Sequence, residues 1–231
     1  MEIQPRKNLL FIFILLLFNT LQISSQSKND ARKVIWDFSF SSGYFFGGPS
    51  NKLDNFLNNS GYNWELREKN YLPLSFDINK TISSKLRVGI YLCTLKQDLL
   101  WETYGWSNSN FNTIIINPYL SYSYKSIVSI NAGPAINRVS FFHSTGTSLE
   151  DDETHLKAGF ILKSNIKYPP KTRLYFQFET LYSYGGTISP YYHIENSTRQ
   201  YTYTTLHVYN LPINYFYVGF GLGIRLYKKI D

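Results

Sequence analysis

Apolar and polar residues alternate one by one along most of the chain after residue 34. Near the end, one face of the pattern holds Phe216, Val218, Phe220, Leu222, Ile224 and Leu226. Strict alternation places apolar side chains on one face of a β-strand and small or polar ones on the other. Eight segments follow this pattern. They predict strands at residues 36–46, 72–79, 86–93, 114–124, 128–136, 156–167, 173–184 and 215–227.

The connections between these segments alternate strictly in length. Short turn-like connections lie at 80–83, 125–126 and 169–171, and long polar ones lie at 47–70, 101–110, 143–153 and 187–211. A closed up-and-down sheet produces this order, because all its short turns lie at one end and all its long loops at the other. We therefore expect an all-β protein, an eight-stranded antiparallel up-and-down β-barrel.

The large rings indicate which face of the barrel is outside. A soluble barrel places its apolar face in the lumen, whereas a transmembrane barrel turns that face to lipid. On the apolar face, rings gather at both ends of the strands, as they do at the two interfaces of a membrane. This favours a transmembrane barrel, with an aromatic girdle formed by Tyr44, Phe46, Tyr122, Tyr124, Tyr168, Tyr182 and Tyr184.

The opposite face carries charges of both signs among small residues. An eight-stranded barrel has room inside only for its own side chains, so we expect a closed, side-chain-filled polar lumen. Buried charges need partners, and we expect Glu179 to pair with a lumenal Lys or Arg. The predicted lumenal charge network consists of Asp37, Asp77, Arg87, Lys163, Arg173, Glu179 and Arg225.

The first 25 residues have the pattern of a targeting sequence and are not expected to form part of the fold. Arg6 and Lys7 precede an apolar run from Leu9 to Phe18, followed by small and polar residues. This order is typical of a secretory signal peptide, and the run is short for a membrane-spanning helix. We expect a signal peptide at 1–25 and a barrel domain at 26–231.

Charge and cysteine content add two limits. The formal net charge is +7, which by itself would suit nucleic acid or an anionic membrane. Because many basic residues fall in the predicted lumen or on short turns, we expect no nucleic-acid partner. Cys93 is the single cysteine, so an intramolecular disulfide is excluded.

Two segments support a family resemblance. They are Ser129–Pro134, which reads Ser-Ile-Asn-Ala-Gly-Pro, and the closing alternation from Tyr217 to Leu226. With the leader, they make residues 34–229 resemble the small eight-stranded outer-membrane barrels of Gram-negative bacteria and the porin-like outer-membrane β-barrel domain family. The resemblance implies short periplasmic turns, long extracellular loops and an outer-membrane location. The chain departs from the family in its end, Tyr227-Lys-Lys-Ile-Asp231, where such proteins typically have an aromatic residue.

Three functions remain open for such a chain, because the family is functionally mixed. The first is a structural or surface-interaction protein, a monomer in outer-membrane lipid that binds a protein or glycan through loops 47–70 and 101–110. The second is a narrow porin-like barrel that binds a solute or ligand. The third is a loop-based lipid hydrolase using the segment 142–145, near the acidic residues 150–153. The first reading needs no catalytic residue, cofactor or metal.

Two local features remain. Pro73, Pro118 and Pro134 interrupt predicted strands, and each removes a backbone donor that lipid cannot replace. Counting outward from the 125–126 turn places Pro118 opposite Pro134, which predicts a bulge or paired gap. In the first long loop, Ser50 can cap a short helix that places Leu53, Phe56 and Leu57 on one face.

Overall fold

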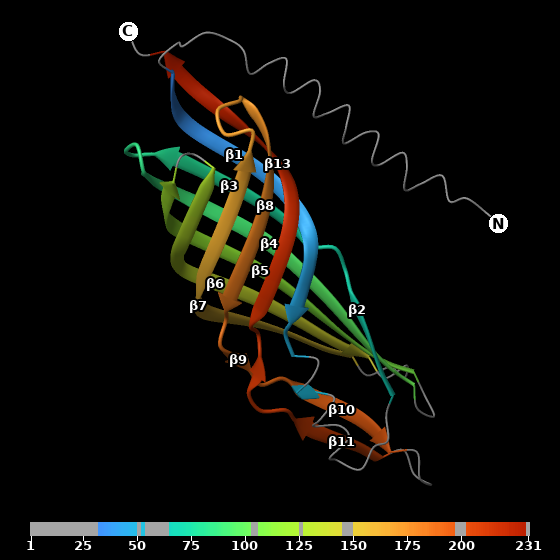
Figure 1. Ribbon diagram of the computed structural model, residues 1–231. Coiled ribbons are helices and arrows are strands. Elements are labelled where there is room, and N and C mark those ends of the chain that lie inside the picture. Colours follow the sequence, from blue (N-terminus) through green and yellow to red (C-terminus); the bar gives the residue numbers. More distant parts are fainter. Residues whose placement is uncertain are drawn as a thin grey trace, which may run out of the picture.

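The computed structural model describes residues 32–49, 52–53, 65–102, 106–124, 127–144, 150–196 and 202–229. The predicted signal peptide and most of the predicted helix at 50–57 lie outside these residues. No helix within the described ranges is long and apolar enough to cross a membrane. The strands (Figure 1) are β1 Arg32–Gly47, β2 Glu65–Asn70, β3 Leu74–Thr81, β4 Leu86–Glu102, β5 Trp106–Tyr124, β6 Val128–Ser144, β7 Glu150–Tyr168, β8 Leu174–Tyr184, β9 Thr187–Ile188, β10 Tyr191–Asn196, β11 Thr202–His207, β12 Leu211–Pro212 and β13 Tyr215–Lys229.

Eight of these strands close into a ring. The order around it is β4, β3, β1, β13, β8, β7, β6 and β5, and β5 pairs again with β4. Every pairing is antiparallel, and the first strand closes on the last through β1 and β13. The predicted eight-stranded up-and-down barrel is therefore confirmed, with short connections from β3 to β4, from β5 to β6 and from β7 to β8.

The register of the pairs fixes the tilt of the strands. A path along paired residues leaves β8 at Tyr184, passes once around the ring, and returns to β8 at Leu174, ten residues earlier. A closed barrel with this stagger has strands inclined to its axis, typically by about 35–45°. Residues at one height on neighbouring strands are therefore offset from the paired positions.

β2 and β3 act as one barrel strand with a break. Both pair with β4, β3 nearer the short-turn end and β2 beyond it. The break spans 71–73, where Pro73 has no amide hydrogen to donate. The backbone N–H of Tyr71 bridges part of it by donating to the Lys96 carbonyl at 3.0 Å, and the Ser42 hydroxyl donates to the Pro73 carbonyl at 2.8 Å.

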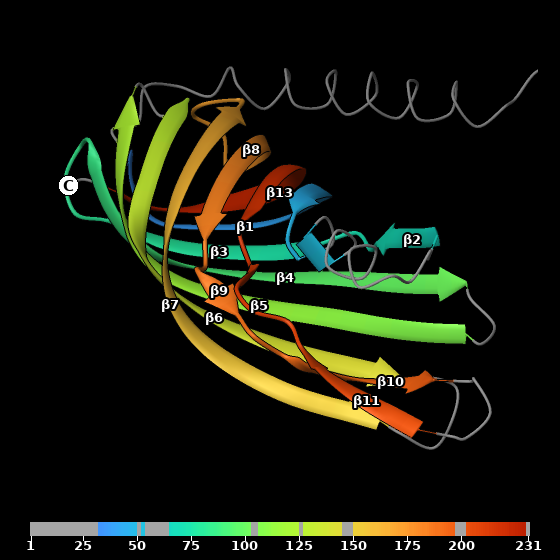
Figure 2. The same cartoon turned by 90° about the horizontal axis from the view of Figure 1, so that it is seen from below.

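Four strands run well beyond the others at the long-loop end. β4 to β7 contain 17, 19, 17 and 19 residues, whereas β8 contains 11. Figure 2 shows them extending past the ends of β1, β8 and β13. The segments 101–110 and 143–153, expected to be loops, are thus mostly strand, and 187–211 contains the β10–β11 hairpin. Alternation continues through these polar segments, so a prediction based on polarity alone made the loops too long.

The paired prolines produce the predicted gap. Pairing of β5 with β6 stops at Ile116↔Ile136 and resumes at Leu120↔Ala132, and Pro118 and Pro134 lie opposite each other between these pairs. Asn117 supplies the missing donor from its side chain. Its Nδ2 donates to the Pro134 carbonyl at 2.6 Å and to the Pro118 carbonyl at 3.2 Å.

The Asn117→Leu variant should lose about 1–3 kcal/mol of folding free energy, because two part-buried carbonyls lose their donor. Urea titration of the protein in vesicles, with the folded fraction read from migration of unboiled samples, measures this loss. Asn112→Leu is the matched control, since Asn112 is exposed on the same strand; its change should stay within about 0.5 kcal/mol. Equal stabilities of the two variants would contradict this role of Asn117.

Candidate functional site: the filled barrel lumen

The lumen near the short-turn end contains a charged cluster centred on Asp37, which is fully buried. Its Oδ2 lies 3.0 Å from Arg87 Nη1, 2.8 Å from Lys167 Nζ and 3.8 Å from Arg225 Nε. The Tyr175 hydroxyl donates to its other oxygen. Five strands thus meet at one carboxylate, which links β1, β4, β7, β8 and β13; we call this the Asp37 cluster.

Arg225 ties the Asp37 cluster to the neighbouring turn. Its Nη1 donates to the carbonyls of Pro169, Pro170 and Thr172 at 3.1, 2.8 and 3.2 Å. Its guanidinium carbon also lies 4.3 Å from the centroid of the Tyr175 ring. Because the cluster holds three cations around one carboxylate, these carbonyls and the ring help to balance its charge.

A second cluster lies nearer the middle of the barrel, around Lys163. The Lys163 ammonium donates to Asp77, lies 3.9 Å from Glu179 Oε2, and lies 3.9 Å from the centroid of the Tyr91 ring. The Tyr119 hydroxyl also donates to Asp77. Glu179 additionally accepts hydrogen bonds from Ser41 and Ser75. This Lys163 cluster carries two carboxylates and one cation, the opposite balance to the Asp37 cluster.

Of the seven sequence-predicted network residues, the structure brings all but Arg173 into these two clusters. Arg173 is exposed and lies on the turn before β8, so its assignment to the lumen is wrong. Alternation stops at the strand end, and a turn residue has no assigned face. Sequence reasoning also left Lys167 out of the network, although it shares the face of Lys163 at an even spacing.

Tyrosines form the rest of the filling, and glycines make the space for them. A Cβ added at any of three lumenal glycines would overlap a tyrosine ring, so the rings lie directly on the glycine backbone. The sequence pattern places these glycines on the lumenal face, where they leave room for another side chain. It does not show which ring occupies that room. The pairs are Gly89 with Tyr119, Gly219 with Tyr217, and Gly223 with Tyr175.

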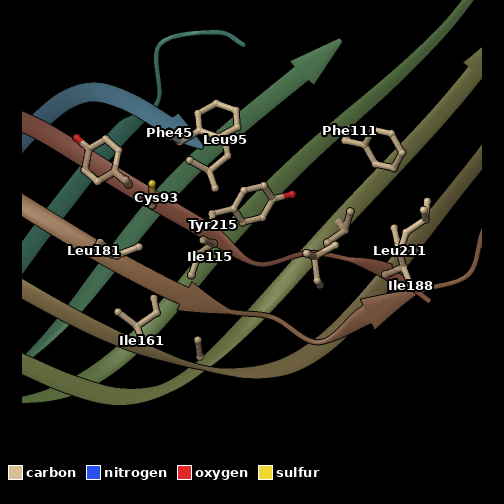
Figure 3. Packing of buried hydrophobic residues seen from close by; sticks show 14 of the residues in the cluster. Phe45, Cys93, Leu95, Phe111, Ile115, Ile161, Leu181, Ile188, Leu211 and Tyr215 are labelled. Carbon is tan, nitrogen blue, oxygen red and sulfur yellow. The ribbon is translucent and has the colours of Figure 1, made fainter. Parts of the chain in front are cut away.

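The lumen at the long-loop end is mostly apolar, so the expectation of a polar lumen is wrong there. Figure 3 shows these side chains packed together between the strands. Phe111 and Phe141 lie with ring centroids 5.0 Å apart. Segments 185–190 and 208–214 cover the cluster and contribute to it. We call it the apolar core; its members include Phe45, Leu95, Leu99, Phe111, Ile115, Val139, Phe141, Ile188, Val208, Leu211 and Ile213.

Polarity therefore inverts along two of the long strands, β5 and β6. On β6, outward positions are apolar from Val128 to Ile136 and become polar at Arg138 and Ser140. Inward positions change the other way, from Ser129 and Asn131 to Val139 and Phe141. β5 shows the same change. One end of the barrel has an apolar exterior, and the extended end has a more polar exterior around an apolar core.

The sequence-predicted girdle residues all lie on the outer surface. Their exposed fractions range from 47% for Tyr122 and Tyr182 to 70% for Tyr44. Two rows of rings result, one at each end of the apolar exterior. The long-loop row contains Tyr44, Phe46, Tyr182 and Tyr184, and the short-turn row contains Tyr122, Tyr124 and Tyr168.

The segment considered for hydrolysis contributes a buried pair instead of an exposed one. His143 Nδ1 lies 2.7 Å from the Ser109 hydroxyl, and both side chains face the interior beside Phe141. The Ser109 hydroxyl is enclosed, whereas Ser144, the serine of the segment 142–145, is half-buried. Among the described residues, no group of three or more His, Cys, Asp or Glu side chains could hold a metal ion.

A closed ring of eight tilted antiparallel strands, with charges inside and apolar residues outside, is the fold of the small outer-membrane β-barrels. Solved structures similar to this chain include Neisserial surface protein A (8% identity, 85% of this chain and 99% of that one, TM-score 0.44). They also include OprG from Pseudomonas aeruginosa (12% identity, 86% and 100%, TM-score 0.47) and AlkL (17% identity, 89% and 95%, TM-score 0.45). Neither the protein-family models nor the curated proteins give a match.

Proposed function

We propose that this protein is an exported outer-membrane barrel with a closed lumen that acts as a structural and surface-interaction protein. The inversion of polarity along β5 and β6 carries this proposal. Apolar outward residues suit lipid only up to the long-loop row of rings. Beyond it, polar outward residues and the apolar core suit water, so this part projects from the membrane as a folded surface.

The filling of the lumen supports a role other than passive transport. The largest fully buried side chains include Arg225, Tyr175, Tyr217 and Lys163, which come from three strands, β7, β8 and β13, and lie inside the ring. Farther along, the apolar core fills the projecting part. A narrow porin-like barrel is the competing function, and discrete single-channel steps in a planar bilayer would establish it at the expense of the closed lumen.

The interaction surface lies on the projecting part and its hairpins. It comprises β2, the outer halves of β4 to β7, and the β10–β11 hairpin. This hairpin lies beside β7, where the Tyr191 backbone N–H donates to Glu153 at 3.0 Å. An extended surface of paired strands presents more fixed positions to a protein or glycan than free loops do, which supports binding there.

Cysteine labelling on intact Gram-negative cells tests this topology. Native Cys93 is buried and gives little background. A membrane-impermeant maleimide should label Thr154→Cys on the projecting part directly, and Ser84→Cys on a short turn only after the outer membrane is permeabilised. Leu162→Cys, in the apolar band, should stay unlabelled until the protein is unfolded. Labelling of Ser84→Cys in intact cells, or a soluble periplasmic pool of the protein, would contradict the proposal.

A further inference from the structure

The gap between the paired prolines is hollowed on the outer surface of the barrel. A groove of about 510 Å³ lies there, in the size range of ligand pockets. It lies between the two rows of rings, within the apolar exterior. We call it the proline groove; it is lined by Val88, Gly89, Pro118, Tyr119, Leu120, Ala132, Gly133, Pro134 and Phe160.

The groove exists because of the way the two strands pass the gap. Neither Pro118 nor Pro134 can donate to the partner strand, so the ladder opens there. Small residues keep its walls low: Ala132 faces outward, and Gly133 lies so close to the Pro118 carbonyl that a Cβ would overlap it. Leu120 and Phe160 rise beside it as exposed apolar side chains.

A cation lies on the same strand above the groove. Arg138 follows Pro134 by four residues, which corresponds to roughly 13 Å along a strand. It is exposed, it points outward, and it lies where the outward face of β6 turns from apolar to polar. Among the described residues no carboxylate forms an ion pair with it.

We propose that the proline groove and Arg138 form a binding site for one phosphate-bearing membrane lipid of net negative charge, in the leaflet on the long-loop side. An acyl chain occupies the groove, and the headgroup phosphate pairs with Arg138. The apolar lining excludes a polar ligand, and the position within the apolar band makes acyl chains the surrounding medium. The charge of Arg138 complements a phosphate, and guanidinium groups bind phosphate well. The site depends on the proposed membrane location, but it does not depend on the surface-interaction role.

Photo-crosslinking tests the site on the full-length protein reconstituted in phosphatidylcholine vesicles. The probes are phosphatidylglycerol and phosphatidylcholine with the same diazirine-bearing acyl chain. We expect more crosslinks at residues 118–120 and 132–134 than on the exposed face of β1 and β13. Ala132→Phe fills the groove and should lower crosslinking there by roughly threefold or more, because apolar contact is lost. Ala158→Phe, an equal change on the exposed face of β7 outside the groove, should leave it unchanged.

The headgroup half of the site has its own variant. Arg138→Gln should lower crosslinking of the phosphatidylglycerol probe at the groove by roughly threefold and leave the phosphatidylcholine probe unchanged, since only one headgroup carries a net negative charge. Migration of unboiled samples checks that each variant is folded, and Ala132→Val replaces Ala132→Phe if the latter does not fold. Even labelling around the barrel, no effect of the groove-filling variants, or crosslinks to a second copy of the chain would overturn the lipid site. Failure of all membrane insertion would instead reject the membrane location.

Discussion

Replacing Asp37 by alanine should destabilise the folded barrel by about 3–5 kcal/mol, the largest effect that we expect of any single lumenal substitution. The variant leaves Arg87, Lys167 and Arg225 in the closed lumen without the carboxylate that they share. Burying a cation without a partner costs free energy, because its lost hydration is not compensated by an opposite charge. The same carboxylate also joins five strands, so the loss affects the whole short-turn end.

Urea titration in vesicles measures the effect, with the folded fraction read from the migration of unboiled samples. Asp152→Asn is the control, because Asp152 is exposed on the projecting part of β7 and should change stability by less than about 0.5 kcal/mol. The double variant Asp37→Asn, Lys167→Met should lose less than Asp37→Asn alone, because one unpaired cation is gone. If Asp37→Ala matched the wild type, the Asp37 cluster would not stabilise the fold.

Alternation was sufficient to predict the ring, because one residue of slip moves every side chain to the wrong face. The eight apolar faces therefore fixed which residues point outward, and the spacing of the turns fixed the order of the strands. The opposition of Pro118 and Pro134 followed from the same counting. The backbone repair by Asn117 did not, because nothing in the sequence shows where an amide side chain will reach.

Two parts of the lumen were beyond the same reasoning. Leu95 and Phe111 point inward, on the same face as the polar residues nearer the short turns. In their segments the outward residues are polar, so the apolar face is the inner one. Recognising the apolar core requires knowing that the strands continue past the apolar exterior and that their pattern then reverses. The prediction for Arg173 is wrong for a different reason. At the end of a strand the turn sets the direction of the side chain, and the alternation of the strand no longer does.

The second large effect concerns the space that glycine leaves for a lumenal ring. Gly223→Val should destabilise the barrel by about 2–5 kcal/mol, which combines overpacking with loss of a buried hydrogen bond. A side chain there would overlap the ring of Tyr175, which is held by Asp37, by Arg225 and by Lys167 at 3.3 Å. The ring would have to leave this position, and Asp37 would lose a donor.

A cycle of variants separates this mechanism from a general intolerance of β13 to larger residues. In a Tyr175→Ala background the ring is absent, so Gly223→Val should cost much less than in the wild type, a coupling of about 0.5–3 kcal/mol. Gly43→Ala gives the contrast, because a Cβ there would overlap the backbone carbonyl of Val218 on β13. No side-chain deletion relieves that overlap, so Tyr175→Ala should not rescue it. Equal costs of Gly223→Val with and without the ring would show that Tyr175 does not depend on the glycine, and the pairing of ring with glycine would then be incidental to stability.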